Sequence, residues 1–135
     1  MDATIAHKRD ELVARLRKAH DIAAASYVLM WDQSTYMPPA GAAARARQVA
    51  SLEGVAHEFA TDPAIGRLLD ELQPYADSLP PDDDDAALVR VARRDYERRT
   101  KVPEDFAATF AGHQTETFSL WAEARPANDF RRVQA

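Results

Sequence analysis

The chain has 135 residues, of which 46% are hydrophobic and 29% charged, and this size and composition suit one globular domain. Its net charge of −5 at pH 7 argues against a nucleic-acid partner, because contacts with phosphate need a basic surface. The absence of cysteine excludes disulfides and thiolate metal sites, and it predicts a cytoplasmic location. Since no apolar run approaches the roughly 20 residues that cross a bilayer, no membrane partner is expected.

The first predicted element is an amphipathic helix over about residues 4–33, where apolar residues recur at three- and four-residue steps. We expect its later half, toward Trp31, to be more buried than its start, because the sequence becomes more apolar there. Met37-Pro38-Pro39 cannot continue a helix and ends it. The inward face is predicted to consist of Leu12, Leu16, Ala19, Ala23, Tyr27 and Met30.

Two further helices are predicted over about residues 42–60 and 63–75. Between them, Thr61-Asp62-Pro63 is typical of an N-cap followed by proline at the first helical position. The inward face of the first of these helices is predicted to be Val49, Leu52, Val55, Ala56 and Phe59. That of the second is predicted to be Ile65, Leu68, Leu69 and Leu72.

Residues 77–85 form a predicted loop with two prolines and the four consecutive aspartates Asp82 to Asp85. We interpret the aspartates as a cap of the next helix, where they complement its positive end. A calcium site is the alternative interpretation, although the spacing of an EF-hand loop is absent.

The last two helices are predicted over about residues 84–100 and 103–124. Their inward faces are predicted to be Leu88, Val89, Ala92 and Tyr96, and Phe106, Phe110, Thr117, Leu120 and Trp121. Short connections join all the predicted helices. The sequence therefore predicts an all-α bundle of four to five largely antiparallel helices in a single domain, residues 1–135.

A hydrolytic zinc site needs two histidines one helical turn apart and a glutamate beside the first. His57 and His113 both fail this pattern, because threonine stands four residues after each of them. A nucleophile elbow and a glycine-rich phosphate loop are also absent from the sequence. We therefore expect no catalytic residue and no metal or cofactor in this chain. A minor alternative is a metal-binding helical bundle built from His57, Glu58, His113 and Glu116.

Residues 27–39 stand out because two tyrosines, two methionines and a tryptophan surround a polar triplet. One interpretation is a helix end buried in the core, with Asp32 or Gln33 bonded to backbone. The other is the wall of a groove or an interface, because aromatic residues and methionine are enriched at such surfaces. The candidate site residues are Tyr27, Met30, Trp31, Asp32, Gln33, Tyr36 and Met37.

The same segment resembles the N-terminal region of the carboxypeptidase Taq family of zinc metallocarboxypeptidases, in Trp31-Asp32-Gln33, Thr35-Tyr36-Met37-Pro38, Gly41 and Arg45-Ala46. Further stretches match in order, including His57-Glu58, Arg93-Arg94-Asp95-Tyr96-Glu97, Lys101-Val102-Pro103 and Asn128-Asp129-Phe130. The resemblance implies a helical, cytoplasmic, often homodimeric zinc enzyme that removes C-terminal residues from peptides. Its N-terminal helices form part of the lid over the catalytic groove, and its catalytic motif lies downstream of the matched region.

Two functions follow from the resemblance. The first is a truncated, carboxypeptidase-like helical protein that is not an enzyme by itself and acts by association. It would form a homo-oligomer or regulate a full-length carboxypeptidase of the same family. The alternative is an N-terminal fragment of an active zinc metallocarboxypeptidase. The initial Met1 favours, slightly, a natural short protein over a fragment.

Overall fold

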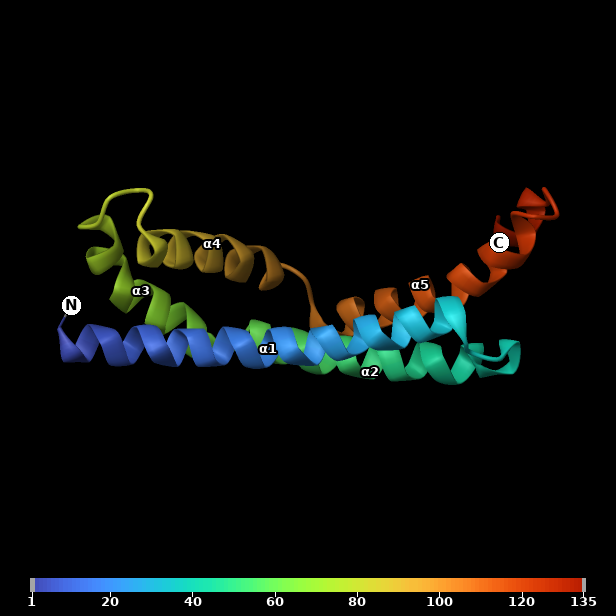
Figure 1. Ribbon diagram of the computed structural model, residues 1–135, viewed down its shortest axis with the longest axis horizontal. Helices are drawn as coiled ribbons and strands as arrows, with labels where there is room; N and C mark the ends of the chain where they lie inside the picture. The colour runs from blue at the N-terminus through green and yellow to red at the C-terminus, as the bar shows by residue number, and fades with distance from the viewer. Residues whose placement is uncertain (1, 135) are drawn as a thin grey trace. The chain divides into compact units, whose positions relative to one another are not determined.

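The computed structural model describes residues 2–134, which contain helices and no strand, as expected for the all-α class (Figure 1). The helices lie close to the predicted ranges. They are α1 (Ala3–Thr35), α2 (Ala42–Ala60), α3 (Pro63–Asp77), α4 (Asp84–Arg99) and α5 (Glu104–Ala124), with the short 3-10 helices η1 (Pro39–Gly41) and η2 (Phe130–Val133). No helix in the described range is long and apolar enough to cross a membrane.

Two of the predicted caps are present. The carboxylate of Asp62 accepts a hydrogen bond of 2.8 Å from the backbone N–H of Ala64 at the start of α3. Asp83 accepts one of the same length from the backbone N–H of Asp85 at the start of α4. Each bond satisfies a backbone donor that has no partner inside the helix. The capping interpretation of the acidic run is therefore confirmed.

The contacts within the chain group its residues into two units. Unit 1 consists of Met1–Asp21 and Ala56–Pro103, and unit 2 of Ile22–Val55 and Glu104–Ala135. The helices α1 and α2 each contribute to both units. Whether the chain behaves as the single domain expected from its sequence stays a prediction.

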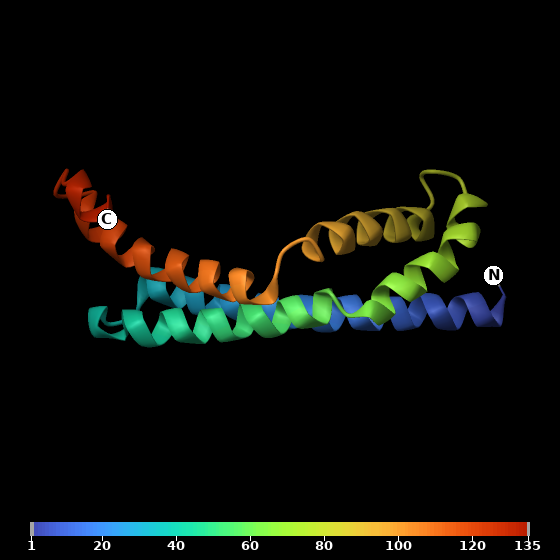
Figure 2. The same ribbon diagram turned by 180° about the vertical axis from the view of Figure 1, so that it is seen from behind.

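Unit 1 contains a core of large aliphatic side chains. The helices α3 and α4 form a hairpin and lie side by side in both views (Figures 1 and 2). The core confirms the predicted inward face of α3, because all four of its residues are buried. The first half of α1 also contributes, through Leu12. The cluster is Leu12, Ile65, Leu68, Leu69, Leu72, Ala76, Val89 and Ala92.

Ion pairs at the edge of this core fix the direction of α1. Lys8 pairs with Glu71 at 3.1 Å and Arg15 with Asp62 at 2.6 Å, so α1 runs antiparallel to α3 in unit 1. Arg9 donates hydrogen bonds to Asp10 and to Asp85, each at 3.0 Å, and these bonds raise the pKa of the guanidinium. These partly exposed pairs orient helices more than they stabilise them.

Unit 2 is built on small side chains. A Cβ placed on Gly54 of α2 would lie 3.6 Å from the Cβ of Ala108 in α5, and one placed on Gly112 would lie 3.4 Å from the Cβ of Ala50. The two helices are therefore close and antiparallel. Such a contact buries little apolar area per residue, since neither surface carries a large side chain.

Three predictions about burial are wrong, and all of them concern unit 2. The later half of α1 is more exposed than its start: Tyr27 is 62% and Met30 48% exposed. The predicted inward face of α5 is also largely exposed, with Phe106 at 58%. Val55 of α2 likewise lies at the surface. For α2 and α5 the reason is the small-residue contact, which brings alanine and glycine inward and leaves large side chains of these two helices outside.

Candidate functional site

The candidate residues lie at the C-terminal end of α1 and in the turn that directly follows it, in unit 2. Tyr27, Trp31 and Tyr36 are exposed, and the rings of Trp31 and Tyr36 meet edge to face with centroids 5.8 Å apart. We call these three residues the α1 aromatic face. Edge-to-face pairs of this kind stabilise ring positions, so the two rings are held in place although solvent surrounds them.

A half-buried arginine holds the end of α1. Arg45 of α2 has a side chain only 12% exposed, and it donates hydrogen bonds to the backbone carbonyl of Leu29 and, at 2.6 Å, to the carboxylate of Asp32. The backbone carbonyl of Asp32 also accepts bonds from the N–H groups of Tyr36 and Met37, which close the last turn. Arg45 therefore fixes the backbone that carries the α1 aromatic face.

Gln33 connects α1 to α5. Its side-chain amide donates to the backbone carbonyl of Thr115 at 3.0 Å and to the hydroxyl of Ser119 at 3.2 Å. The expectation that Asp32 or Gln33 bonds to backbone is met by Gln33, whereas the carboxylate of Asp32 pairs with a side chain. A pocket of about 250 Å³ opens beside this bond, lined by Met30, Gln33, Ser34, Gln114, Thr115 and Phe118.

The remaining candidate, Met37, is partly buried against the turn that follows α1. A Cβ on Gly41 would lie 3.0 Å from the Cγ of Met37, so the glycine makes room for the methionine. The structure thus brings Met30 and Gln33 together in a pocket and places the aromatic candidates on the surface. Their role in a groove or an interface stays a prediction.

A second exposed face, on α5, was not identified from the sequence as a candidate site. We call Phe106, Phe110, Leu120 and Trp121 the α5 aromatic face. The rings of Phe106 and Phe110 stack with centroids 5.9 Å apart. One signal was available in the sequence: Glu116 is the only Asp, Glu, Lys or Arg between residues 106 and 122. A helix with so few charges is normally covered by other parts of a protein.

The described residues do not fit a hydrolytic metal site. Between residues 2 and 134, no three His, Asp or Glu side chains come together in a group that could hold a metal ion. The alternative site built from His57, Glu58, His113 and Glu116 is therefore not formed. A metal ligand set needs three or four such side chains converging on one point.

The solved structure titled "BsuCP Crystal Structure" has the same fold, with a TM-score of 0.85 at 24% identity, over 94% of this chain and 25% of that chain. Thermostable carboxypeptidase 1 of Thermus thermophilus is 37% identical over 115 residues, which are 85% of this chain and 22% of the relative. Carboxypeptidase 1 of Bacillus subtilis is 26% identical over 115 residues, 85% of this chain and 23% of the relative. The chain thus spans about a quarter of the length of the proteins that it matches. The profile of the Carboxypeptidase Taq (M32) metallopeptidases matches residues 11–135, and the chain belongs to this family.

Proposed function

We propose that this chain is a helical part of an M32 metallocarboxypeptidase that works by association and does not hold the catalytic zinc itself. Its partner in this proposal is the portion of such an enzyme that carries the zinc chemistry. In this proposal the chain positions and covers the portion that carries the zinc, and that portion hydrolyses the peptide. Removal of C-terminal residues from peptides is then an activity of the assembled enzyme.

One observation carries the proposal. Twelve of the fourteen large hydrophobic side chains that are exposed in the described part of the chain belong to unit 2. Exposed apolar surface of this extent is rare on a protein that works alone and marks a surface for another protein. The α1 and α5 aromatic faces supply most of it, and aromatic residues dominate the energetics of such interfaces.

The length comparison supports the choice of partner. The sequence relative and the solved structure match this chain over about a quarter of their own length. The other three quarters of an M32 protein are therefore available to cover a surface that this quarter leaves exposed. The chemistry points the same way, because a zinc peptidase needs histidine and glutamate ligands that residues 2–134 do not assemble.

Association of two copies through the same faces is a second proposal. It is favoured by the low charge of residues 106–122 of α5, because a face without strong charge of either sign can pack against itself in a symmetric dimer. The two proposals predict different molar masses for the complex and different effects on the rate of peptide hydrolysis. Measurements of the rate and of the mass therefore separate them.

The first measurement is an assay for release of C-terminal amino acids from a peptide in the presence of added zinc. We expect no release by the purified chain alone. Mixed with the full-length Thermus thermophilus relative, the chain is expected to change the rate in a manner that saturates with its concentration. Release by the chain alone would overturn the proposal that zinc chemistry resides in the partner.

The second measurement is light scattering after size-exclusion chromatography, with surface variants. Phe110→Ser in the α5 aromatic face is expected to weaken association of either kind. Val91→Ser is the matched control, because Val91 is also an exposed apolar residue of a helix but belongs to unit 1. A monomer at high concentration that leaves the relative's rate unchanged would contradict both proposals.

A further inference from the structure

A strongly basic segment lies in unit 1, apart from the aromatic faces of unit 2. Residues 90–101 contain six arginine or lysine residues and two acidic residues, so their net charge is +4 in a chain of net charge −5. The basic residues are Arg90, Arg93, Arg94, Arg98, Arg99 and Lys101. The aliphatic core of unit 1 does not need this local excess of positive charge.

Three of these arginines line up along one side of α4. Arg90, Arg94 and Arg98 follow one another at four-residue intervals and are exposed, whereas Val89 and Ala92 face the core. At 1.5 Å of rise per residue the three side chains span about 12 Å of the helix. We call them the basic stripe.

The basic stripe retains most of its hydrogen-bond donors. Arg90 makes one bond of 3.2 Å, to the backbone carbonyl of Pro81, and Arg94 pairs with its neighbour Asp95 at 2.9 Å. Within the described residues, Arg98 forms neither a salt bridge nor a side-chain hydrogen bond. Each guanidinium has five N–H donors, so the stripe can bind further acceptors without losing these contacts.

Arg93 differs from the stripe in this respect. It bonds to Gln73 at 2.9 Å and to Asp70 at 3.0 Å and thereby joins α4 to α3. Its positive charge is paired with the carboxylate of Asp70 within the fold. The charges of Arg90, Arg94 and Arg98 hold no two helices together, which leaves them available to a partner.

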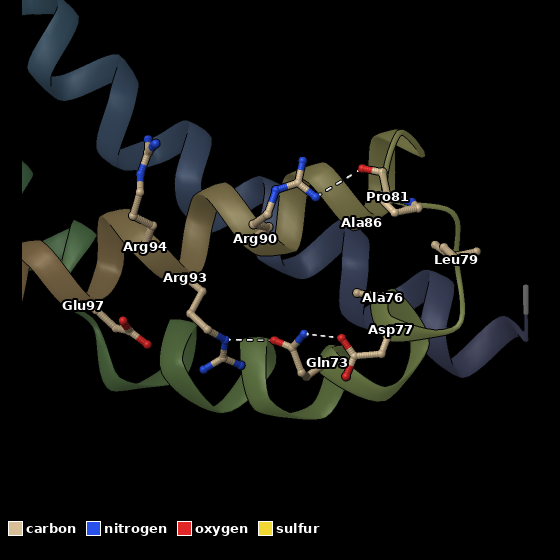
Figure 3. Close-up of a pocket in the computed structure, with 10 residues that line it drawn as sticks. All are labelled: Gln73, Ala76, Asp77, Leu79, Pro81, Ala86, Arg90, Arg93, Arg94 and Glu97. Carbon is tan, nitrogen blue, oxygen red and sulfur yellow. Dashed lines mark hydrogen bonds between the residues drawn. The ribbon is translucent and has the colours of Figure 1, made fainter.

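A pocket of about 520 Å³ lies beside the basic stripe (Figure 3). Ala76, Leu79, Pro81 and Ala86 give it apolar walls, and Arg90 and Arg94 are among its polar residues. Figure 3 shows α3 on one side of the pocket and α4 on the other, with the loop of Leu79 and Pro81 at one end. The site therefore combines guanidinium groups with room for an apolar side chain.

We propose that the basic stripe and this pocket bind an acidic segment of another protein that also carries an apolar side chain. Carboxylates of the segment pair with Arg90, Arg94 and Arg98, because guanidinium groups match carboxylates in geometry and charge. The apolar side chain occupies the pocket. The residues of this site belong to unit 1 and those of the aromatic faces to unit 2, so the inference does not rest on the proposed function.

A protein segment fits the site better than a nucleic acid does. The apolar walls of the pocket suit an aliphatic side chain, which a protein segment supplies and a nucleic-acid strand does not. None of the residues that line the pocket is aromatic, and stacking of bases on aromatic rings is the usual second component of single-strand binding.

The test uses the full chain and a fluorescent peptide in which two glutamates flank a leucine on each side. Binding is measured by fluorescence anisotropy at low salt and again at high salt. We expect Arg94→Glu combined with Arg98→Glu to weaken binding about tenfold or more, because two attractive charges become repulsive. The affinity of the native chain should fall with salt and with replacement of the glutamates by glutamines.

The matched control is Arg131→Glu combined with Arg132→Glu, which makes the same change in net charge at exposed positions of unit 2. It is expected to keep the native affinity within about twofold. Equal loss in the two double variants would overturn the proposal, since net charge alone would then explain binding. Tighter binding of a single-stranded oligonucleotide of equal charge, or no binding of the acidic peptide, would overturn it as well.

Discussion

Tyr96 of α4 lies directly against the backbone of Gly66 in α3: a Cβ added to the glycine would be 2.9 Å from the tyrosine hydroxyl oxygen and 3.1 Å from the ring carbon Cζ. The absence of a side chain on Gly66 thus makes the space that the ring occupies. This contact lies within the α3–α4 hairpin, and Tyr96 also packs against the core of unit 1.

Gly66→Ala is therefore expected to destabilise the chain, although alanine favours a helix. The added methyl group must displace the ring of Tyr96, and overpacking of this kind costs about 1–3 kcal/mol of the free energy of unfolding. The measurement is urea denaturation followed by circular dichroism. Gly112→Ala is the control: its nearest contact would be an ordinary 3.4 Å, and helix propensity raises stability there by up to about 1 kcal/mol. Equal losses at the two glycines would contradict the role of Tyr96.

The stability of the chain is expected to fall with rising pH through Tyr75. Burial, and next a hydrogen bond to Asp85 at 3.2 Å, raise the pKa of this hydroxyl above its usual value of 10.0. The unfolded chain then releases the proton at a lower pH than the folded chain does. The contribution of Tyr75 to the free energy of unfolding is therefore present below about pH 10 and is lost as the pH rises above this value.

Tyr75→Phe removes this titration, so its free energy of unfolding should decline less steeply than that of the native chain between about pH 8 and about pH 11. Urea denaturation at several pH values in this range measures the two slopes. Tyr27→Phe, at an exposed position, should keep the native slope. If the free energy of unfolding falls with the same slope in all three proteins, Tyr75 does not contribute to its pH dependence.

The N-cap of α4 is expected to depend on one aspartate of the acidic run, Asp83. Asp83→Ala removes the cap of α4 and should lower the free energy of unfolding by about 1 kcal/mol. Asp82→Ala, one residue earlier and exposed, should leave it unchanged. Thermal denaturation of both variants, with and without calcium, decides the point. Stabilisation of the native chain by calcium that both variants lose would support a cation site instead.

Arg45 is expected to be the residue of α2 whose loss most affects the end of α1. Arg45→Ala leaves the carboxylate of Asp32 and the carbonyl of Leu29 without their donor, and we expect a loss of about 1–3 kcal/mol. Arg45→Lys should restore little of it, because an ammonium group does not reproduce the two-sided geometry of guanidinium. Urea denaturation measures stability, and fluorescence of Trp31, measured in a Trp121→Phe background because the chain has two tryptophans, reports on the end of α1. Arg47→Ala, at a nearby exposed position, is the control and should match the native chain.

The sequence by itself determined where the helices begin and end. Pro38 and Pro39 end α1, Asp62 and Pro63 start α3, and the aspartates before residue 84 start α4. These signals are local, because a cap or a proline acts on backbone groups within one turn. The inward face of α3 was also predictable, since Ile65, Leu68, Leu69 and Leu72 are its large aliphatic residues.

Only the tertiary structure decided which face of α5 turns inward. The spacing of Phe106, Phe110, Leu120 and Trp121 does describe one face of a helix, but that face is exposed. The opposite side carries Gly112 and Ala108, which allow α5 to approach α2 closely. Periodicity reports that large side chains share a face and does not report what covers it. The partner of a face is a property of the whole fold, so the exposure of the α5 aromatic face could be recognised only once the neighbours of α5 were known.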